Sequence, residues 1–213
     1  IRVEMHFLPD VYVTCDVCKG RRYNHETLEV RYKGLNIAEV LDLPVQQARA
    51  FFENYPVLER RLAVLEEVGL EYLRLGQPAT TLSGGERQRA AIARAILLEP
   101  RVLLADEPTT ALDVTIQDQI MKLLNQLKQE LGMSIILVTH DLGVIAQMCD
   151  RVAVMYAGQI VEMTDTVTLF SRPRHPYTYG LMGSLPNEET AGTTLEAIKG
   201  SPPNLAHLPE GCP

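Results

Sequence analysis

Two different periodicities divide the first third of the chain. Residues 1–33 contain short runs that alternate apolar and polar residues, such as LEVRY at positions 28–32, around a polar turn. A period of two is typical of strands, so we expect a small β-rich module there. From about residue 37 to residue 75 the apolar residues recur every three or four positions, which predicts successive helices that start near Pro44 and Pro56.

The middle of the chain predicts a parallel βαβ unit. Residues 84–98 have helical spacing up to Pro100, and RVLLAD at 101–106 is a short apolar run of the kind buried in a parallel sheet. Helical spacing returns at 114–131, and MSIILVTH at 133–140 is a second apolar run. Two apolar strands joined by a helix predict an α/β fold with a parallel sheet and flanking helices.

The remaining sequence predicts a hairpin and then a loose tail. RVAVMYAGQIVEM at 151–163 has strand character on both sides of a turn at residues 156–159. After Phe170 the chain is rich in Pro, Gly, Thr and Ser. We expect an extended C-terminal tail with one or two short helices.

Composition narrows the function classes. The 213 residues carry a net charge of −7, which does not favour nucleic-acid binding by the chain as a whole, although it leaves room for a local basic patch. The sequence has no apolar run of about 18 residues, and Arg2 and Glu4 lie where a signal peptide needs apolar residues. Four unevenly placed cysteines do not form a disulfide framework. These features predict a cytoplasmic protein, and the start at Ile1 and the end at EGCP lead us to expect that both ends are cut.

Two short motifs carry candidate phosphate and metal chemistry. Ser83, Gly84 and Gly85 begin a predicted helix, where bare N–H groups and the helix dipole suit a phosphate. The alternative interpretation is a serine N-cap followed by a flexible glycine pair. Asp106 and Glu107 follow an apolar strand, at the edge where α/β folds place ligand chemistry. Asp106 would bind Mg²⁺ and Glu107 would act as general base, unless both are only a solvated strand end.

A histidine follows the next predicted strand. His140 lies where it can reach a γ-phosphate or orient a water, although a single histidine at a strand end is more often a capping residue.

Taken in order, LSGGERQR, an apolar strand with DEP, TALD, and an apolar strand with TH resemble the ATP-binding-cassette (ABC) ATPases. They correspond to the signature, Walker B, D-loop and switch histidine of that family. The resemblance implies ATP and Mg²⁺ as cofactors and a head-to-tail dimer with a second ABC subunit. It also implies roles for single residues: nucleotide contact for Ser83, Gly84, Gly85 and Glu86, Mg²⁺ for Asp106, catalysis for Glu107, a subunit bridge for Asp113 and γ-phosphate sensing for His140.

The phosphate-binding loop of such an enzyme is absent from the sequence. A P-loop needs Gly-x-x-x-x-Gly-Lys-Ser/Thr, because backbone amides wrap the phosphates while the lysine reaches the β and γ oxygens. The dipeptide Gly-Lys occurs nowhere in the 213 residues. We therefore expect little ATP hydrolysis by the chain alone, and exposed apolar surface on RVLLA and SIILV where the P-loop strand and helix would pack.

The two halves resemble different branches of the family. Residues 1 to about 86, with CDVCKGRRYN and LRLGQPATTLSGGE, resemble the second cassette of the UvrA family, the damage-recognition ATPases of bacterial nucleotide excision repair. Residues from about 87 onward, including RPRHPYTYG, are similar to ATP-binding subunits of dipeptide and oligopeptide importers. A chimera joined at the shared LSGGE is the simplest explanation.

This comparison predicts four segments. They are a remnant of a zinc- and DNA-binding module (1–36), a helical subdomain (37–81), the C-terminal half of an ABC ATPase domain (82–170) and an importer-type tail (171–213).

The N-terminal segment carries weak metal and DNA signals. Cys15 and Cys18 form only one of the two Cys-x-x-Cys pairs of the UvrA zinc site. His6 or His25 would have to replace the missing cysteine ligands, so we expect a turn that is left over from the zinc site and binds no zinc. Contact with DNA phosphates is one interpretation of four basic residues, and a solvated hairpin is the simpler one; the residues are Arg21, Arg22, Arg31 and Lys33. Farther along, Cys149 is expected to be a small core residue, and Cys212 cannot hold a cluster alone.

Three functions remain open. The first is an ABC ATPase subunit that couples ATP hydrolysis to peptide import with a membrane permease, held at the inner face of the cell membrane. The second is a UvrA-like repair ATPase that binds damaged DNA. The third is a non-catalytic chimeric module.

Overall fold

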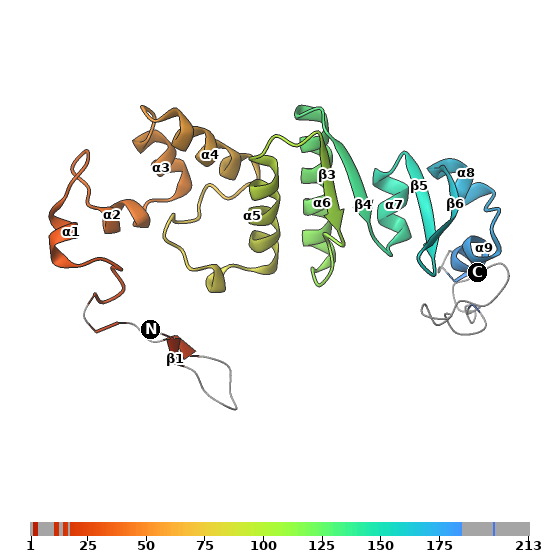
Figure 1. Ribbon diagram of the computed structural model, residues 1–213, viewed down its shortest axis with the longest axis horizontal. Coiled ribbons are helices and arrows are strands. Elements are labelled where there is room, and N and C mark those ends of the chain that lie inside the picture. The colour runs from red at the N-terminus through yellow and green to blue at the C-terminus, as the bar shows by residue number, and fades with distance from the viewer. Residues whose placement is uncertain (1, 4–10, 13–14, 17, 185–197, 199–213) are drawn as a thin grey trace. The chain divides into compact units, whose positions relative to one another are not determined.

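The computed structural model describes residues 2–3, 11–12, 15–16, 18–184 and 198, and Figure 1 shows its helices and strands in chain order. The chain divides into two compact units. The first comprises the residues up to Leu103 together with Thr109–Ser134, and the second comprises Leu104–Pro108 and the residues from Ile135 onward. In the part of the chain that is described, no helix is both long enough and apolar enough to cross a bilayer.

The first unit is mainly helical. Two very short strands, β1 (Arg2–Val3) and β2 (Val11–Tyr12), pair antiparallel. The helices are α1 (His25–Glu29), α2 (Ile37–Asp42), α3 (Val45–Phe51), α4 (Pro56–Glu67), the 3-10 helix η1 (Ala79–Thr81), α5 (Gly84–Ile96) and α6 (Val114–Glu130).

Two predictions in this unit are wrong in detail. The run LEVRY was expected to be a strand, but α1 contains Leu28 and Glu29, because Asn24 caps that helix by accepting a 3.0 Å hydrogen bond from the N–H of Thr27. The helix expected to continue beyond residue 67 ends there, because Gly69 has φ +74° and turns the chain.

A small apolar core holds the predicted helical segment together. The side chains of Val45, Ala48 and Leu62 are buried where α3 packs against α4. Half-buried residues complete this core: Leu43, Phe52, Leu65 and Leu75. The segment that leads to the signature is attached to the same helices, because the N–H of Val45 donates to the carbonyl of Leu73 over 2.8 Å.

The second unit contains most of the strands. Its elements are β3 (Val102–Asp106), which begins in the first unit, β4 (Ser134–Val138), which also begins there, α7 (Leu142–Met148), β5 (Arg151–Tyr156), β6 (Gln159–Asp165), α8 (Thr166–Ser171) and α9 (Pro176–Gly183). Strand β3 pairs with β4. The N–H of Ser134 donates to the carbonyl of Arg101, and the N–H of Glu107 donates to the carbonyl of Val138. Residue numbers therefore increase in the same direction along both strands, so the pairing is parallel.

One face of this strand pair is apolar and exposed. Leu104 is 66% exposed, Ile136 55% and Val138 48%. Successive residues of a strand point to opposite faces, so Ile136 and Val138 share one face of β4, and the two hydrogen bonds between the strands set Leu104 beside Ile136 on that face. The exposed apolar surface expected on RVLLA and SIILV is therefore confirmed.

The predicted hairpin is confirmed. Strands β5 and β6 pair antiparallel, and the turn between them places Ala157 and Gly158 at φ +48° and +79°, as in a tight two-residue hairpin turn. Val152, Val154 and Leu169 form the core under the hairpin. Cys149 packs against this core, as predicted for a small apolar residue. Helix α9 is a short helix of the kind expected in the tail, whereas α8 begins before Phe170, and Cys212 lies outside the described residues.

Candidate functional site

The signature serine begins α5 in a capping box. Ser83 is the N-cap residue, and its hydroxyl oxygen accepts a 3.2 Å hydrogen bond from the N–H of Glu86. In return the Oε2 atom of Glu86 accepts a 2.6 Å hydrogen bond from the N–H of Ser83. The Ser83 side chain remains exposed and keeps its own O–H as a donor.

The two signature glycines rest on the D-loop and on α6. A Cβ atom at Gly84 would lie 3.0 Å from Cδ2 of Leu112, and one at Gly85 would lie 2.9 Å from Cγ2 of Ile116. Neither glycine has a positive φ. Close packing therefore accounts for glycine here, and it brings the start of α5 against the start of α6.

Asp113 begins the neighbouring helix. Its carboxylate caps α6 by accepting a 2.9 Å hydrogen bond from the N–H of Ile116. The loop before it is held by Gln117, whose side-chain amide donates to the carbonyls of Thr109 and Leu112 over 3.1 and 3.3 Å. The first unit thus brings together the signature and D-loop residues that the sequence singled out.

A tyrosine that the sequence did not reveal contacts the signature. The hydroxyl of Tyr72 donates a 2.8 Å hydrogen bond to Oε1 of Glu86. The N–H of Ser83, and after it the hydroxyl of Tyr72, lower the pKa of the Glu86 carboxyl below its ordinary value. The pKa of Tyr72 is raised, first by partial burial and second by its hydrogen bond to the Glu86 carboxylate. No motif or spacing in the sequence connects residue 72 with residue 86.

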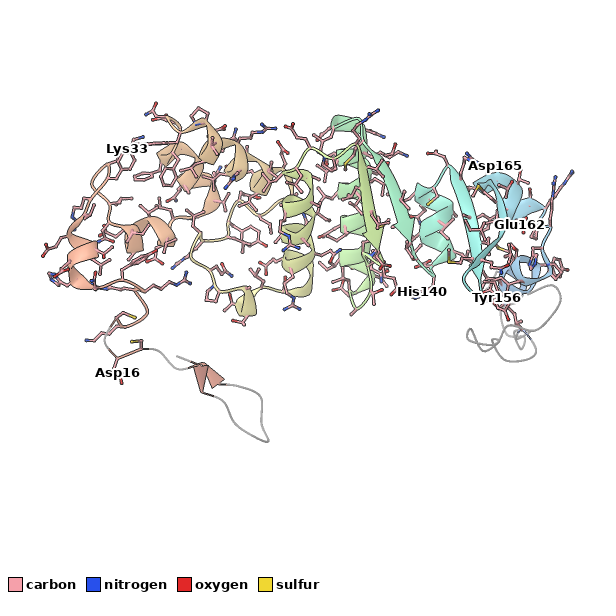
Figure 2. All side chains as sticks on the ribbon, viewed as in Figure 1. Asp16, Lys33, His140, Tyr156, Glu162 and Asp165 are labelled. Carbon is pink, nitrogen blue, oxygen red and sulfur yellow. The ribbon has the colours of Figure 1, made fainter. Side chains whose placement is uncertain are left out.

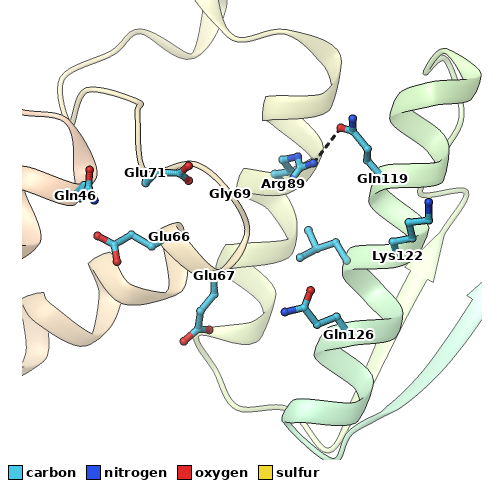
Figure 3. Close-up of a pocket in the computed structure, with 10 residues that line it drawn as sticks. Gln46, Glu66, Glu67, Gly69, Glu71, Arg89, Gln119, Lys122 and Gln126 are labelled. Carbon is cyan, nitrogen blue, oxygen red and sulfur yellow. Dashed lines mark hydrogen bonds between the residues drawn. The ribbon is translucent and has the colours of Figure 1, made fainter.

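Arg89 joins three helices beside the signature. Its guanidinium donates to the carbonyl of Val68, at the end of α4, over 2.7 Å, and to the side chain of Gln119 on α6 over 3.2 Å, as Figure 3 shows for the second bond. Arg89 and Gln119 line an open hollow of about 460 Å³. These bonds hold α5 in place relative to α4 and α6.

The second unit positions the predicted catalytic carboxylate. Glu107 directly follows Asp106, the last residue of β3, and its φ is +44°, in the left-handed region that non-glycine residues rarely adopt. The hydrogen bond from its N–H to Val138 fixes this backbone over 2.8 Å.

His140 lies next to this carboxylate. Its Nδ1 atom is 3.1 Å from Oε1 of Glu107, and the histidine follows the end of β4 (Figure 2). The capping role falls to Asp141, which accepts hydrogen bonds from the N–H groups of Gly143 and Val144 at the start of α7. The structure therefore pairs the carboxylate with the histidine, as an acid–base pair requires.

Comparisons with known proteins connect this geometry to a family. A family model described as "ABC transporter" matches residues 19–110, and one described as "Oligopeptide/dipeptide transporter, C-terminal region" matches residues 161–213. The crystal structure of UvrA2 from Deinococcus radiodurans superimposes with a TM-score of 0.65 at 39% identity, covering 85% of this chain and 24% of that one. The chain belongs to the ABC ATPases.

Both branches expected from the sequence are among the relatives of this ABC ATPase. UvrABC system protein A of Vibrio cholerae is 53% identical over 148 residues, which are 68% of this chain and 16% of that protein. Oligopeptide transport ATP-binding protein OppD of Haemophilus influenzae is 54% identical over 140 residues, 66% of this chain and 43% of that protein. The chain thus spans less than half of either relative. The matched lengths of 148 and 140 residues add to more than the 213 residues of this chain, so the two matches overlap along part of it.

The cysteine pair of this ABC ATPase lies in a tight turn. Cys15 and Cys18 are half-buried, and their carbonyls accept hydrogen bonds from Lys19 and Arg21. The Nδ1 atom of His25 lies 3.2 Å from Oε1 of Glu29. His6 lies outside the described residues. Across the residues that are described, no three His, Cys, Asp or Glu side chains are grouped to hold a metal ion.

Three of the four predicted basic residues bind within the chain. Arg22 donates to the carbonyl of Gly76. Arg31 donates to the carbonyl of Gly34 over 2.7 Å, and Lys33 to that of Phe51 over 2.9 Å. These cations help to fold the N-terminal segment of the ABC ATPase.

The importer-type C-terminal region is fastened by a glutamate. Glu162, labelled in Figure 2, lies on β6. It accepts hydrogen bonds from the N–H groups of Arg174 and His175 over 2.9 and 3.0 Å, and His175 caps α9. Burial by itself would raise the pKa of the Glu162 carboxyl, but the hydrogen bonds around it, first that from the N–H of His175, together lower it by more, so the net pKa is below its ordinary value. No pattern in the sequence predicts this contact.

Proposed function

We propose that this chain is an ABC ATPase subunit that offers its signature to ATP bound on a partner subunit and thereby serves peptide import. The observation that carries the proposal is the exposed Ser83 at the start of α5, where free helix N–H groups and a hydroxyl can face a phosphate. Asp113 starts the adjacent helix, where it would face the same partner.

On this proposal the P-loop that faces Ser83 belongs to the partner, and the 213 residues contain no Gly-Lys of their own. Asp106 fits a magnesium site in its chemistry, because Mg²⁺ prefers carboxylate oxygens and this side chain is exposed at the end of β3. Bound Mg²⁺ would neutralise charge on the phosphates of ATP. Glu107, next to His140, would accept the proton of the attacking water, and His140 would orient the γ-phosphate.

The importer role is supported by the C-terminal region. Residues 161–213 match the oligopeptide and dipeptide transporter region, and Glu162 anchors the RPRHP segment at its start. On this proposal the chain works in the cytoplasm against a membrane permease, with a second cassette as its head-to-tail partner.

The test is complementation in trans. The partner is an importer-type ABC subunit with an intact P-loop whose own signature serine is replaced by arginine, and phosphate release is measured as this chain is added. We expect background release from this chain alone and a rise in the mixture.

A matched control separates capping from signature chemistry. Ser83→Ala removes an N-cap worth about 1 kcal/mol together with the signature hydroxyl. Asn36→Ala removes the N-cap of the same capping-box geometry on α2, where Asn36 and Glu39 exchange bonds of 2.8 and 3.0 Å. Ser83→Ala should abolish the stimulation and Asn36→Ala should preserve it. If the unaltered chain gives no stimulation, the non-catalytic module is the correct description.

A second candidate function is DNA repair. It is supported by the 53% identity to UvrABC system protein A and by Lys19, Arg21 and Arg22, which line a hollow of about 230 Å³. On this candidate the chain binds a damaged duplex, measured by fluorescence anisotropy, and Arg21→Ala lowers the slope of log affinity against log salt by about one. Absence of binding at low salt would reject it. Zinc belongs to this candidate too, and Cys15 and Cys18 would supply two of its four ligands.

A further inference from the structure

The Glu86 carboxylate receives a hydrogen bond at each of its two oxygens. Oε2 accepts from the N–H of Ser83 over 2.6 Å, and Oε1 accepts from the hydroxyl of Tyr72 over 2.8 Å. A carboxylate held at both oxygens cannot rotate without breaking one of these bonds. The orientation of Tyr72 is thereby transmitted to the backbone of Ser83.

Capping alone does not require the tyrosine. The capping box of α2 has the same reciprocal geometry, and there the Oε2 of Glu39 that accepts the Asn36 N–H also accepts a 3.3 Å bond from Arg31. A flexible arginine on the surface satisfies the second contact in α2, whereas an aromatic side chain with only two rotatable bonds satisfies it at the signature. The tyrosine is therefore the stiffer of the two supports.

The backbone on both sides of Tyr72 is attached to α3. The N–H of Gln46 donates to the carbonyl of Glu71 over 3.1 Å, and the N–H of Val45 donates to that of Leu73 over 2.8 Å. Val45 belongs to the buried core between α3 and α4. Tyr72 thus connects the signature N-cap with a packed part of the same unit.

We propose that Tyr72 is a positioning residue for the signature: through Glu86 it fixes the Ser83 N–H and hydroxyl in the direction that faces nucleotide. This role rests on the proposed function. Tyr72 touches no reacting atom, so its loss should lower the maximal stimulated rate and leave the affinity for the partner subunit unchanged.

The substitution that tests it is Tyr72→Phe, which keeps the ring and removes the hydroxyl. In the complementation assay we expect the maximal rate to fall about three- to tenfold, the size expected for one hydrogen bond to a charged group in an exposed site. The concentration of chain that gives half-maximal stimulation should stay the same. Tyr55→Phe is the control, since it removes another partly exposed hydroxyl from the same unit, and it should leave both values unchanged.

A second measurement needs no partner and no ATP. In carbon-detected NMR of the full chain, Tyr72→Phe should raise the pKa of the Glu86 carboxyl and speed amide exchange at Ser83, while Tyr55→Phe should do neither. In a Glu86→Gln background, Tyr72→Phe should have little further effect on the exchange of Ser83. A thermal melt confirms that each variant is folded.

The outcomes distinguish the two proposals. If the unaltered chain fails to stimulate a partner but Tyr72→Phe changes the NMR readouts, the proposed function is lost and the link from Tyr72 to Ser83 stands. If Tyr72→Phe leaves the Glu86 pKa and the Ser83 exchange unchanged, or lowers the rate no more than Tyr55→Phe does, the positioning role is refuted.

Discussion

Replacing Gly85 by alanine tests whether the signature glycine is required by packing. The added methyl group would lie 2.9 Å from Cγ2 of Ile116, closer than carbon atoms pack. Gly85 is buried and its φ is not positive, so the backbone itself accepts alanine. The change in stability therefore depends on two opposing contributions: the higher helix propensity of alanine stabilises the chain, and the close contact with Ile116 destabilises it.

The magnitude follows from these two opposing contributions. Alanine in place of a helical glycine stabilises a helix by up to about 1 kcal/mol, and less in the first turn. Forcing a methyl group into a packed contact costs about 1–3 kcal/mol. We expect Gly85→Ala to lower the free energy of unfolding by about 1–2 kcal/mol.

The assay is urea unfolding of the full chain, supported by thermal melts in which about 1 kcal/mol corresponds to roughly 2–4 °C for a chain of this size. Gly183→Ala is the matched control, because Gly183 ends α9 and an added Cβ meets nothing within 4 Å. That variant should be neutral or more stable.

A double mutant isolates the contact. Ile116→Ala removes the methyl group that the new side chain meets, so the two substitutions together should destabilise the chain by less than the sum of their separate effects, by about 1 kcal/mol. The packing argument fails if Gly85→Ala behaves like Gly183→Ala, or if the two effects simply add.

Three further predictions concern other parts of the chain. Because the folded pKa of Glu162 is lowered, its hydrogen bonds stabilise the chain above the unfolded pKa of about 4.3 and lose that effect as pH falls through the lower folded pKa; thermal melts should show Glu162→Gln less stable than the unaltered chain at pH 7, with a gap that closes in acid. Arg89→Met should destabilise by about 1–2 kcal/mol in urea by removing the bonds to Val68 and Gln119 while keeping the apolar stem, whereas Arg94→Met, on the exposed side of α5, should not. Leu104→Ser should reduce binding of a hydrophobic dye without lowering the melting temperature, because Leu104 is 66% exposed; an unchanged dye signal would contradict the exposed apolar face.

The sequence predicted well where one local pattern decides the structure. Ser83 starts α5 because a serine N-cap and a glutamate three residues later satisfy two helix N–H groups within a single turn. The hairpin follows from two strand-like runs on either side of a turn with Gly158, which adopts its positive φ of +79° at low cost.

Prediction failed where a distant or hidden contact decides. LEVRY has strand periodicity, but the Asn24 cap favours a helix that continues to Glu29. Tyr72 lies 14 positions before Glu86, and only the folded chain brings the hydroxyl to the carboxylate. The sequence of β3 is equally apolar whether or not other strands and helices cover it. The solvent exposure of its side chains therefore depends on the fold and cannot be read from its composition.

The close packing of Gly85 against Ile116 also limits which segments can be exchanged between members of this family. If the chain is joined near residue 86, Tyr72 and Gly85 descend from one parent and Ile116 from the other, and the two parents meet at a contact with no spare room. The segment from the second parent would be accepted only if it places a side chain no larger than isoleucine at position 116. Recombination at a shared motif is thus tolerated only where a side chain outside the motif fits a glycine inside it.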